Sequence, residues 1–267
     1  MILTPLQLGL GGFSGTLVGF TLGLVGGGGS ILAVPLMLYV VGIKNPHIAI
    51  GTSALAVAAN AATGLFNHHR AGTVRWQCGG MFAVAGVLGA LFGSSAGKAF
   101  DGQKLLFLFA LLMIAVGILM LRRRRNTGND AAECKRQNAP KVLSIGLATG
   151  LFSGFFGIGG GFLIVPGLLI STGMPVLNAI GTSLIAVTAF GLTTAFNYAL
   201  SGLVDWPLAI VFILGGFLGS FFGMRTARFL SGTAGRLNTV FAGLIFAVAV
   251  YMLYRSAAAL GFNLSAL

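Results

Sequence analysis

The chain alternates between long apolar stretches and short polar loops. In its first half the apolar runs predict helices over residues 6–25, 31–41, 47–66, 76–97 and 105–121. Four of these approach or exceed the ~20 residues that cross a bilayer, whereas residues 31–41 would cover only about half of its ~30 Å core. The pattern therefore predicts an all-α polytopic membrane protein, in which each half has about four long helices and one short half-helix.

One hydrophilic segment interrupts this pattern near the middle of the chain. Residues 122–141 contain four consecutive arginines and seven basic residues in all. We interpret this segment as a basic cytoplasmic linker between a first membrane repeat, residues 1–121, and a second membrane repeat, residues 142–267.

The second half repeats the first. A glycine-rich stretch ending in Val34-Pro35 recurs 131 positions later, and Ala49-Ile50-Gly51-Thr52-Ser53 recurs unchanged 130 positions later. The repeated glycines of the first stretch are Gly19, Gly23, Gly26, Gly28 and Gly29, which match Gly150, Gly154, Gly157, Gly159 and Gly160. Further on, Gly86, Gly89 and Gly93 match Gly216, Gly219 and Gly223. These matches indicate an internal duplication, and the later glycines predict closely packed helix faces.

Each copy of the glycine-rich stretch should break a membrane helix. Gly26–Gly29 are four consecutive glycines, each of which costs about 1 kcal/mol relative to alanine within a helix. We expect the helix to restart near Ser30 or Ile31, with Ser30 as its N-cap. Hydrocarbon tolerates such a break only where protein or a cavity surrounds it, and paired breaks in two repeats are typical of a transporter's binding site.

The basic residues predict how the two halves face the membrane. If the two repeats are inverted, 12 of the 16 Lys and Arg residues lie on the cytoplasmic side, against 10 if they are parallel. Cytoplasmic loops are enriched in Lys and Arg, so the pattern favours inverted repeats.

Composition narrows the class of protein. The chain is 56% hydrophobic and 7% charged, and its net charge of +12 resides in loops between apolar runs. We therefore expect the lipid bilayer, and not nucleic acid, as its surroundings. We find no P-loop, no nucleophile–base pair and no metal cluster in the predicted spans, so the sequence does not indicate an enzyme or a cofactor. Oligomeric state is left open.

The breaks suggest an anion site. Helix N-termini present unpaired N–H groups and the positive end of the helix dipole, and glycine allows close approach of a ligand. Nearby Ser, Thr and Asn side chains could add donors, although the hydroxyls could instead bond to their own helix and the asparagines could be helix caps. The candidate substrate-binding residues are Gly27, Gly28, Gly29, Ser30, Thr52, Ser53, Asn67, Gly159, Gly160, Gly161, Thr182, Ser183 and Asn197.

The paired G-x-x-x-G-x-x-G-x-G-G motifs, the proline after each, and the repeated A-x-G-T-S resemble the TauE/SafE sulfite exporter family. The resemblance covers both halves. It implies transport, chiefly export, of small sulfur-containing anions such as sulfite or organosulfonates. Ser30 stands opposite Gly161, and Gly27 opposite Ile158, so the two half-sites are unequal.

The hypothesis from sequence is a secondary transporter of these anions in the cell membrane, driven by the membrane potential because no acidic residue lies clearly within a span. Two alternatives stay open. A passive anion channel would share the same lining, and a membrane subunit or sensor would bind a partner through the basic linker.

Overall fold

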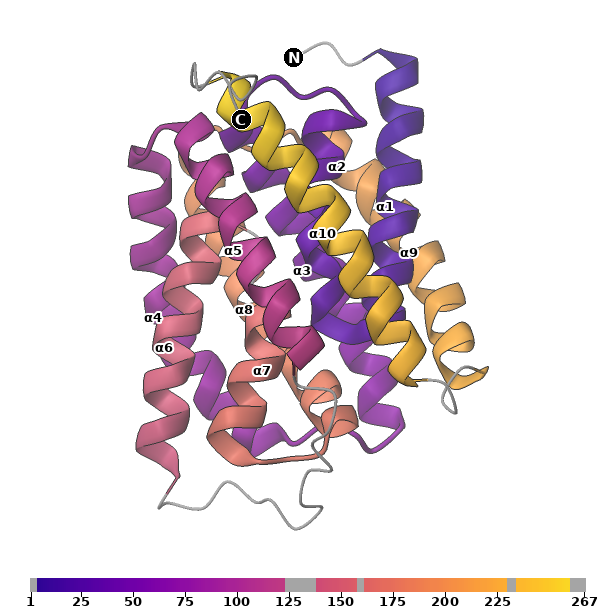
Figure 1. Ribbon diagram of the computed structural model, residues 1–267, viewed down its shortest axis with the longest axis vertical. Coiled ribbons are helices and arrows are strands. Elements are labelled where there is room, and N and C mark those ends of the chain that lie inside the picture. Colours follow the sequence, from indigo (N-terminus) through magenta and orange to yellow (C-terminus); the bar gives the residue numbers. More distant parts are fainter. Residues whose placement is uncertain (1–3, 123–137, 158–160, 230–233, 260–267) are drawn as a thin grey trace.

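The computed structural model describes residues 4–122, 138–157, 161–229 and 234–259, and within them the protein is a bundle of α-helices without strands (Figure 1). The all-α prediction is thus confirmed. In the first half the elements are α1 (Pro5–Val25), a 3-10 helix η1 (Gly26–Leu32), α2 (Ala33–Tyr39), α3 (Pro46–Arg70), α4 (Trp76–Ala99) and α5 (Gly102–Arg122). In the second half they are α6 (Ala139–Phe156), α7 (Gly161–Thr172), α8 (Val176–Ala199), α9 (Trp206–Phe229) and α10 (Ala234–Ala259).

The outer surface of the bundle is apolar. Five helices in the described part of the chain, α3, α4, α6, α8 and α9, are long and apolar enough to cross a membrane. Large side chains point outward from them, and Phe92, Phe196 and Leu214 are 71%, 64% and 63% exposed. Exposed apolar area of this extent is unfavourable in water and favourable in hydrocarbon, which agrees with the expected membrane environment.

The loops that flank α3 and α8 have matching backbone conformations in the two halves. The side chain of Asn45 accepts a hydrogen bond from the backbone N–H of His47 at 2.9 Å and so caps α3. The loops before α3 and α8 contain Gly42 and Gly173, with φ of +79° and +70°. The loops after these helices contain Gly72 and Gly202, with φ of +69° and +68°. The duplication therefore extends to the backbone conformation of the loops.

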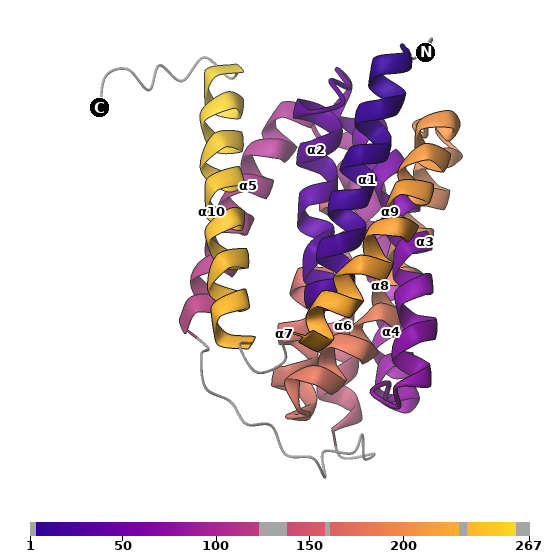
Figure 2. The same cartoon turned by 90° about the vertical axis from the view of Figure 1, so that its right-hand side faces the viewer.

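The two halves of the chain are interleaved. The first helix of each half packs against the fourth α-helix of the other half, so that α1 contacts α9 and α6 contacts α4. Across the middle α3 packs against α8, and α5 packs against α10 at one side of the bundle (Figure 2). Every one of these contacts is matched by its equivalent under exchange of the halves.

Glycines allow the closest of these contacts, as the sequence predicted. A Cβ on Gly93 of α4 would collide with the backbone of Leu151 in α6, and a Cβ on Gly223 of α9 would collide with the backbone of Phe20 in α1. Backbones approach this closely only where side chains are absent. The orientation of the two repeats in a membrane and the domain boundaries stay predictions, and most of the linker lies outside the described residues.

Candidate functional site

The first glycine cluster interrupts the helix as expected. The α-helix stops at Val25, a 3-10 turn runs from Gly26 to Leu32, and the α-helix resumes at Ala33. Gly29 folds back onto the last turns of α1, where an added Cβ would lie 2.7 Å from the Thr21 hydroxyl. The prediction that Ser30 caps the restarted helix is wrong, because the 3-10 turn continues past it and Leu32 occupies the cap position. Gly27, Gly28 and Ser30 all lie in this turn, and Ser30 is fully buried.

The second cluster also interrupts its helix. α6 ends at Phe156, and Gly157 adopts a left-handed conformation (φ +65°) that stops it. An L side chain there would be strained and would also collide with Ile50. Gly161, at which the sequence predicted the restart, is the first residue of α7. Gly159 and Gly160 lie outside the described residues.

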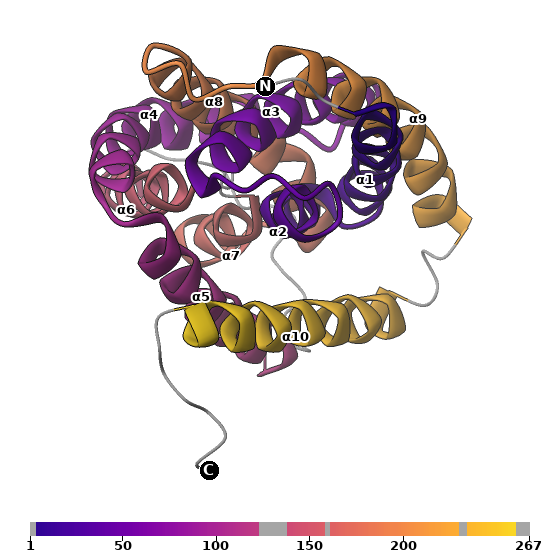
Figure 3. The same cartoon turned by 90° about the horizontal axis from the view of Figure 1, so that it is seen from above.

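The first interruption packs against the half-helix that follows the second. η1 of the first half packs against α7 of the second, and also contacts α8 and α3. Seen from above, α2 and α7 lie near the centre of the bundle with other helices around them (Figure 3). The irregular backbone of η1 is thus enclosed by protein, which is the condition under which hydrocarbon accepts it.

The two threonines of the repeated Gly-Thr-Ser connect the halves. The hydroxyl oxygen of Thr52 on α3 accepts a hydrogen bond from the N–H of Asp205 at the start of α9, at 3.0 Å. The hydroxyl oxygen of Thr182 on α8 accepts one from the N–H of Arg75 at the start of α4, also at 3.0 Å. Each threonine therefore satisfies the N-terminus of a helix in the other half.

The neighbouring serines bond within their own helices. The Ser53 hydroxyl donates to the carbonyl of Ile50 at 3.0 Å, and the Ser183 hydroxyl donates to the carbonyl of Ile180 at 2.7 Å. This is the local alternative to ligand binding that the sequence left open. Both hydroxyl oxygens retain acceptor capacity, so a role for these two serines in a substrate site stays a prediction.

The two asparagines differ in their surroundings. The Asn67 amide donates to the Thr63 carbonyl of its own helix at 3.2 Å. The Asn197 amide donates to Ser94 at 2.6 Å, and its carbonyl oxygen accepts from the Lys98 ammonium at 2.8 Å. Asn197 therefore joins the ends of α8 and α4, and the structure does not bring it together with Asn67.

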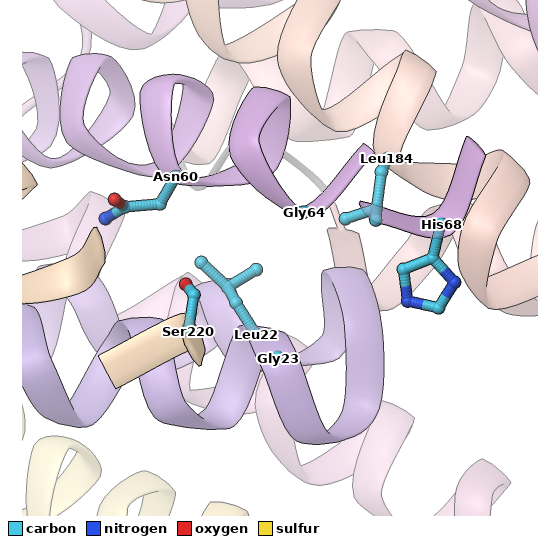
Figure 4. Close-up of a pocket in the computed structure, with 7 residues that line it drawn as sticks. All are labelled: Leu22, Gly23, Asn60, Gly64, His68, Leu184 and Ser220. Carbon is cyan, nitrogen blue, oxygen red and sulfur yellow. The ribbon is translucent and has the colours of Figure 1, made fainter. Parts of the chain in front are cut away.

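A small cavity lies beside the first interruption (Figure 4). The space open to the centre of a water molecule is about 10 Å³, which is room for a single water. Asn60 and Ser220 lie toward one end of the cavity, and His68 lies at the other. Its lining residues are Leu22, Gly23, Asn60, Gly64, His68, Leu184 and Ser220. The Ser220 hydroxyl donates to the Gly19 carbonyl at 3.1 Å.

Asn60 is not among the site residues predicted from the sequence. Its side chain is 2% exposed, and neither its amide nitrogen nor its carbonyl oxygen has a hydrogen-bond partner in the part of the chain that the structure describes. An unpaired buried polar group costs about 1–3 kcal/mol. The available signal was a lone asparagine in the run Ala58-Ala59-Asn60-Ala61-Ala62, in the middle of a predicted span.

A second, open pocket of about 570 Å³ lies between the ends of α2 and α10 and the start of α5. Lys44 and Arg255 line it together with Tyr39 and Tyr254, and no acidic side chain is among its described lining residues. The lining of this pocket therefore carries positive charge.

Five long apolar helices, an apolar outer surface and two interrupted helices in contact inside the bundle define a multi-pass membrane protein. The family model for the sulfite exporter TauE/SafE matches residues 12–252, and the chain belongs to that family. It is a family of membrane transporters, so the structure is that of a transporter.

Curated relatives agree with this class. A probable membrane transporter protein of Xylella fastidiosa (strain 9a5c) is 53% identical over 92% of this chain and 95% of its own length. The probable membrane transporter proteins YdhB and YunE of Bacillus subtilis are each 26% identical, over 78% and 80% of this chain and 86% of their own lengths. No solved structure matches the chain.

Proposed function

We propose that the protein is a secondary transporter that carries small sulfur-containing anions, of the sulfite and organosulfonate class, out of the cell. The family description supports the substrate class, since it names sulfite exporters. The relatives are named only as probable membrane transporters, so they support the class of protein and leave the anion to be tested.

One observation carries the proposal: the interrupted backbone at Gly26–Leu32 is enclosed in the bundle and packs against α7, the half-helix of the other repeat. A 3-10 turn makes weaker backbone hydrogen bonds than an α-helix, and N–H groups at such interruptions and at helix N-termini bind oxyanions. The proposed site comprises these backbone groups and those at the start of α7, with the repeated Gly-Thr-Ser segments beside them.

Inverted repeats would let such a site open to either side in turn. Figure 1 supports this arrangement, because α1 begins at the upper end of the bundle and α6, its counterpart, begins at the lower end. The basic pocket beside Lys44 and Arg255 would concentrate anions at one mouth of the path.

The membrane potential supplies the driving force in this proposal. With the cell interior negative, moving a monoanion outward is favourable by roughly 2.3 kcal/mol per 100 mV. No acidic side chain lies in the middle of a described span, so the proposal does not need a proton relay built on carboxylates.

Flux measurements in proteoliposomes test the function. We expect the wild-type protein to move sulfite with saturation and with a rate that rises with imposed voltage. The Gly28→Leu variant should lose most of this flux, because the added side chain would occupy the proposed site at the interruption. Gly80→Leu is the matched control, since no atom lies within 4 Å of a Cβ at Gly80, and its flux should stay near the wild-type value.

Three outcomes would contradict the proposal. The first is no flux of sulfite, thiosulfate or any small organosulfonate. The second is flux that responds to a pH gradient and not to voltage, which would replace the energy source. The third is flux that never saturates, which would favour a channel.

A further inference from the structure

The starting point is the amide of Asn60, which lies in the middle of α3. It is almost fully buried, and both its donor and its acceptor lack a partner among the described residues. Polar side chains inside membrane proteins are unfavourable, and they mark functional positions more often than structural ones. Asn60 therefore requires an explanation that its contacts within the protein do not give.

Packing does not supply that explanation. The equivalent residue in the second half is Phe190, which is fully buried and lies over Gly86 as Asn60 lies over Gly216. A large apolar side chain is thus accommodated at the equivalent place in the same architecture. The fold itself does not demand an amide at Asn60.

The position of Asn60 points to the transport path. It lines the cavity together with Leu22 and Gly23, the last turn of α1 before the glycine interruption. The cavity is lined on α3 by Asn60, Gly64 and His68, and helices of both halves complete the lining (Figure 4). It therefore runs beside the backbone that the proposed function assigns to the anion.

The equivalent region of the other half also contains buried polar atoms that lack hydrogen-bond partners among the described residues. Ser153, Thr194 and Tyr198 correspond to Leu22, Gly64 and His68 of the cavity lining. The hydroxyls of these three residues are buried and have no hydrogen-bond partner among the described residues. Unpaired polar atoms thus line this region in both halves, on α3 in one and on α6 and α8 in the other, although at different positions of the repeat.

We propose that Asn60 contacts the transported anion, and that the cavity beside it is a closed segment of the path. This inference rests on the proposed function. An amide with both edges free matches a ligand that accepts one hydrogen bond and donates another. The monoprotonated form of an oxyanion, such as hydrogen sulfite, does both. A sulfonate accepts only and would leave the Asn60 carbonyl oxygen unpaired.

Replacement by leucine separates a ligand contact from a structural role. The Asn60→Leu variant removes an unpaired buried amide, so its thermal unfolding midpoint should equal or exceed that of the wild type. Its sulfite flux should fall roughly ten- to a hundredfold, as for the loss of one hydrogen bond to a charged group. Ser14→Ala is the control. It removes a different buried polar group, a hydroxyl without a partner among the described residues and outside this lining, and flux should not change.

Replacement of Asn60 by aspartate should give a pH dependence of flux that a purely structural role would not produce. An ionised carboxylate at this position would repel the anion. Once protonated, the carboxyl again offers one donor and one acceptor. Sulfite flux of Asn60→Asp, divided by that of the wild type at each pH, should therefore recover as pH falls. His68, the titratable residue in the described lining, is common to both proteins and cancels in this ratio.

The outcomes distinguish this inference from the proposed function. If the wild type carries no sulfur oxyanion, both fail. If the wild type is active and Asn60→Leu keeps its KM and maximal flux, only the inference fails, and a bound water is the partner of the amide. Only the inference fails, too, if the sulfite flux of Asn60→Asp relative to the wild type does not change with pH. A loss of flux for sulfite that exceeds the loss for a sulfonate is the expected result.

Discussion

Thr52 and Thr182 are equivalent residues of the duplicated sequence, and they hold the two halves together in the same way. Each hydroxyl accepts a hydrogen bond from the backbone N–H of the residue just before a helix of the other half. Both threonine side chains are fully buried. A sequence repeat that looks like a ligand motif is therefore also a structural connection between repeats.

The Thr52→Val substitution tests this role. It keeps the shape of the side chain and leaves the N–H of Asp205 unpaired, so the free energy of unfolding should fall by about 1–3 kcal/mol. Denaturant unfolding in detergent measures the change. Ser53→Ala is the matched control, because the Ser53 hydroxyl bonds only within its own helix and its loss should have a smaller effect. Equal losses of unfolding free energy in the two variants would show that the bond between the halves contributes no more than the bond within a helix.

At the level of elements, glycine determines which helices touch. The contact of α4 with α6 places Gly89, Gly93 and Gly97 against backbone atoms of the other helix, and the contact of α1 with α9 repeats this arrangement. Small residues at four-residue spacing lie on one face of a helix, so a continuous stripe of backbone is available for packing.

Substitution within this stripe should be far more harmful than substitution beside it. Gly93→Val would force a side chain into the backbone of α6, and we expect the thermal midpoint to drop sharply, with a cost of at least ~1–3 kcal/mol for overpacking. Gly80→Val lies on the same helix with nothing within 4 Å of its Cβ, so it should be tolerated. Similar midpoints for the two variants would contradict the close packing of α4 and α6.

Sequence patterns predicted these elements well and their partners poorly. The helix predicted over residues 76–97 spans Trp76–Ala99, and both glycine interruptions occur where expected. The helix predicted over residues 47–66 continues to Arg70, because Asn67 and His68 end the apolar run but not the hydrogen bonding. Partners were not predictable, since several helices have glycine faces, and any two such faces could pack together.

The candidate site shows the same limit. Glycine content revealed the interruptions because it acts on the local backbone, which the sequence determines directly. The hydrogen bonds of Thr52 and Thr182 and the unpaired amide of Asn60 depend on residues more than 100 positions away or on the absence of any partner. Such features appear only once the helices are assembled.

For the whole molecule, interleaving limits how it can move. Separating the two sequence halves as rigid bodies would pull α1 from α9 and α4 from α6, and these contacts join backbone to backbone. A transport cycle must therefore keep each of these pairs together and move them relative to other helices. The pair α5 and α10, which stands at one side of the bundle in Figure 2, is the natural candidate for an independently moving unit.

Cutting the chain tests interleaving directly. Residues 1–121 alone lack the partners of α1 and α4, so this fragment should be degraded or aggregated when expressed by itself. Residues 142–267 should behave likewise. Co-expressed, the two fragments should copurify and recover the fold, because the cut falls in the linker. Stable, monomeric fragments would show that each half folds by itself and would contradict the cross-half packing.

Interleaving also has a consequence for biogenesis. α1 ends at Val25 and its partner α9 begins at Trp206, about 180 residues later. At a synthesis rate of ~5–20 residues per second, α1 waits roughly 10–40 s before its partner leaves the ribosome. Throughout this time its glycine face is open to lipid or to the insertion machinery. The membrane must therefore retain the first helix without its main partner until nearly the last helix has been made.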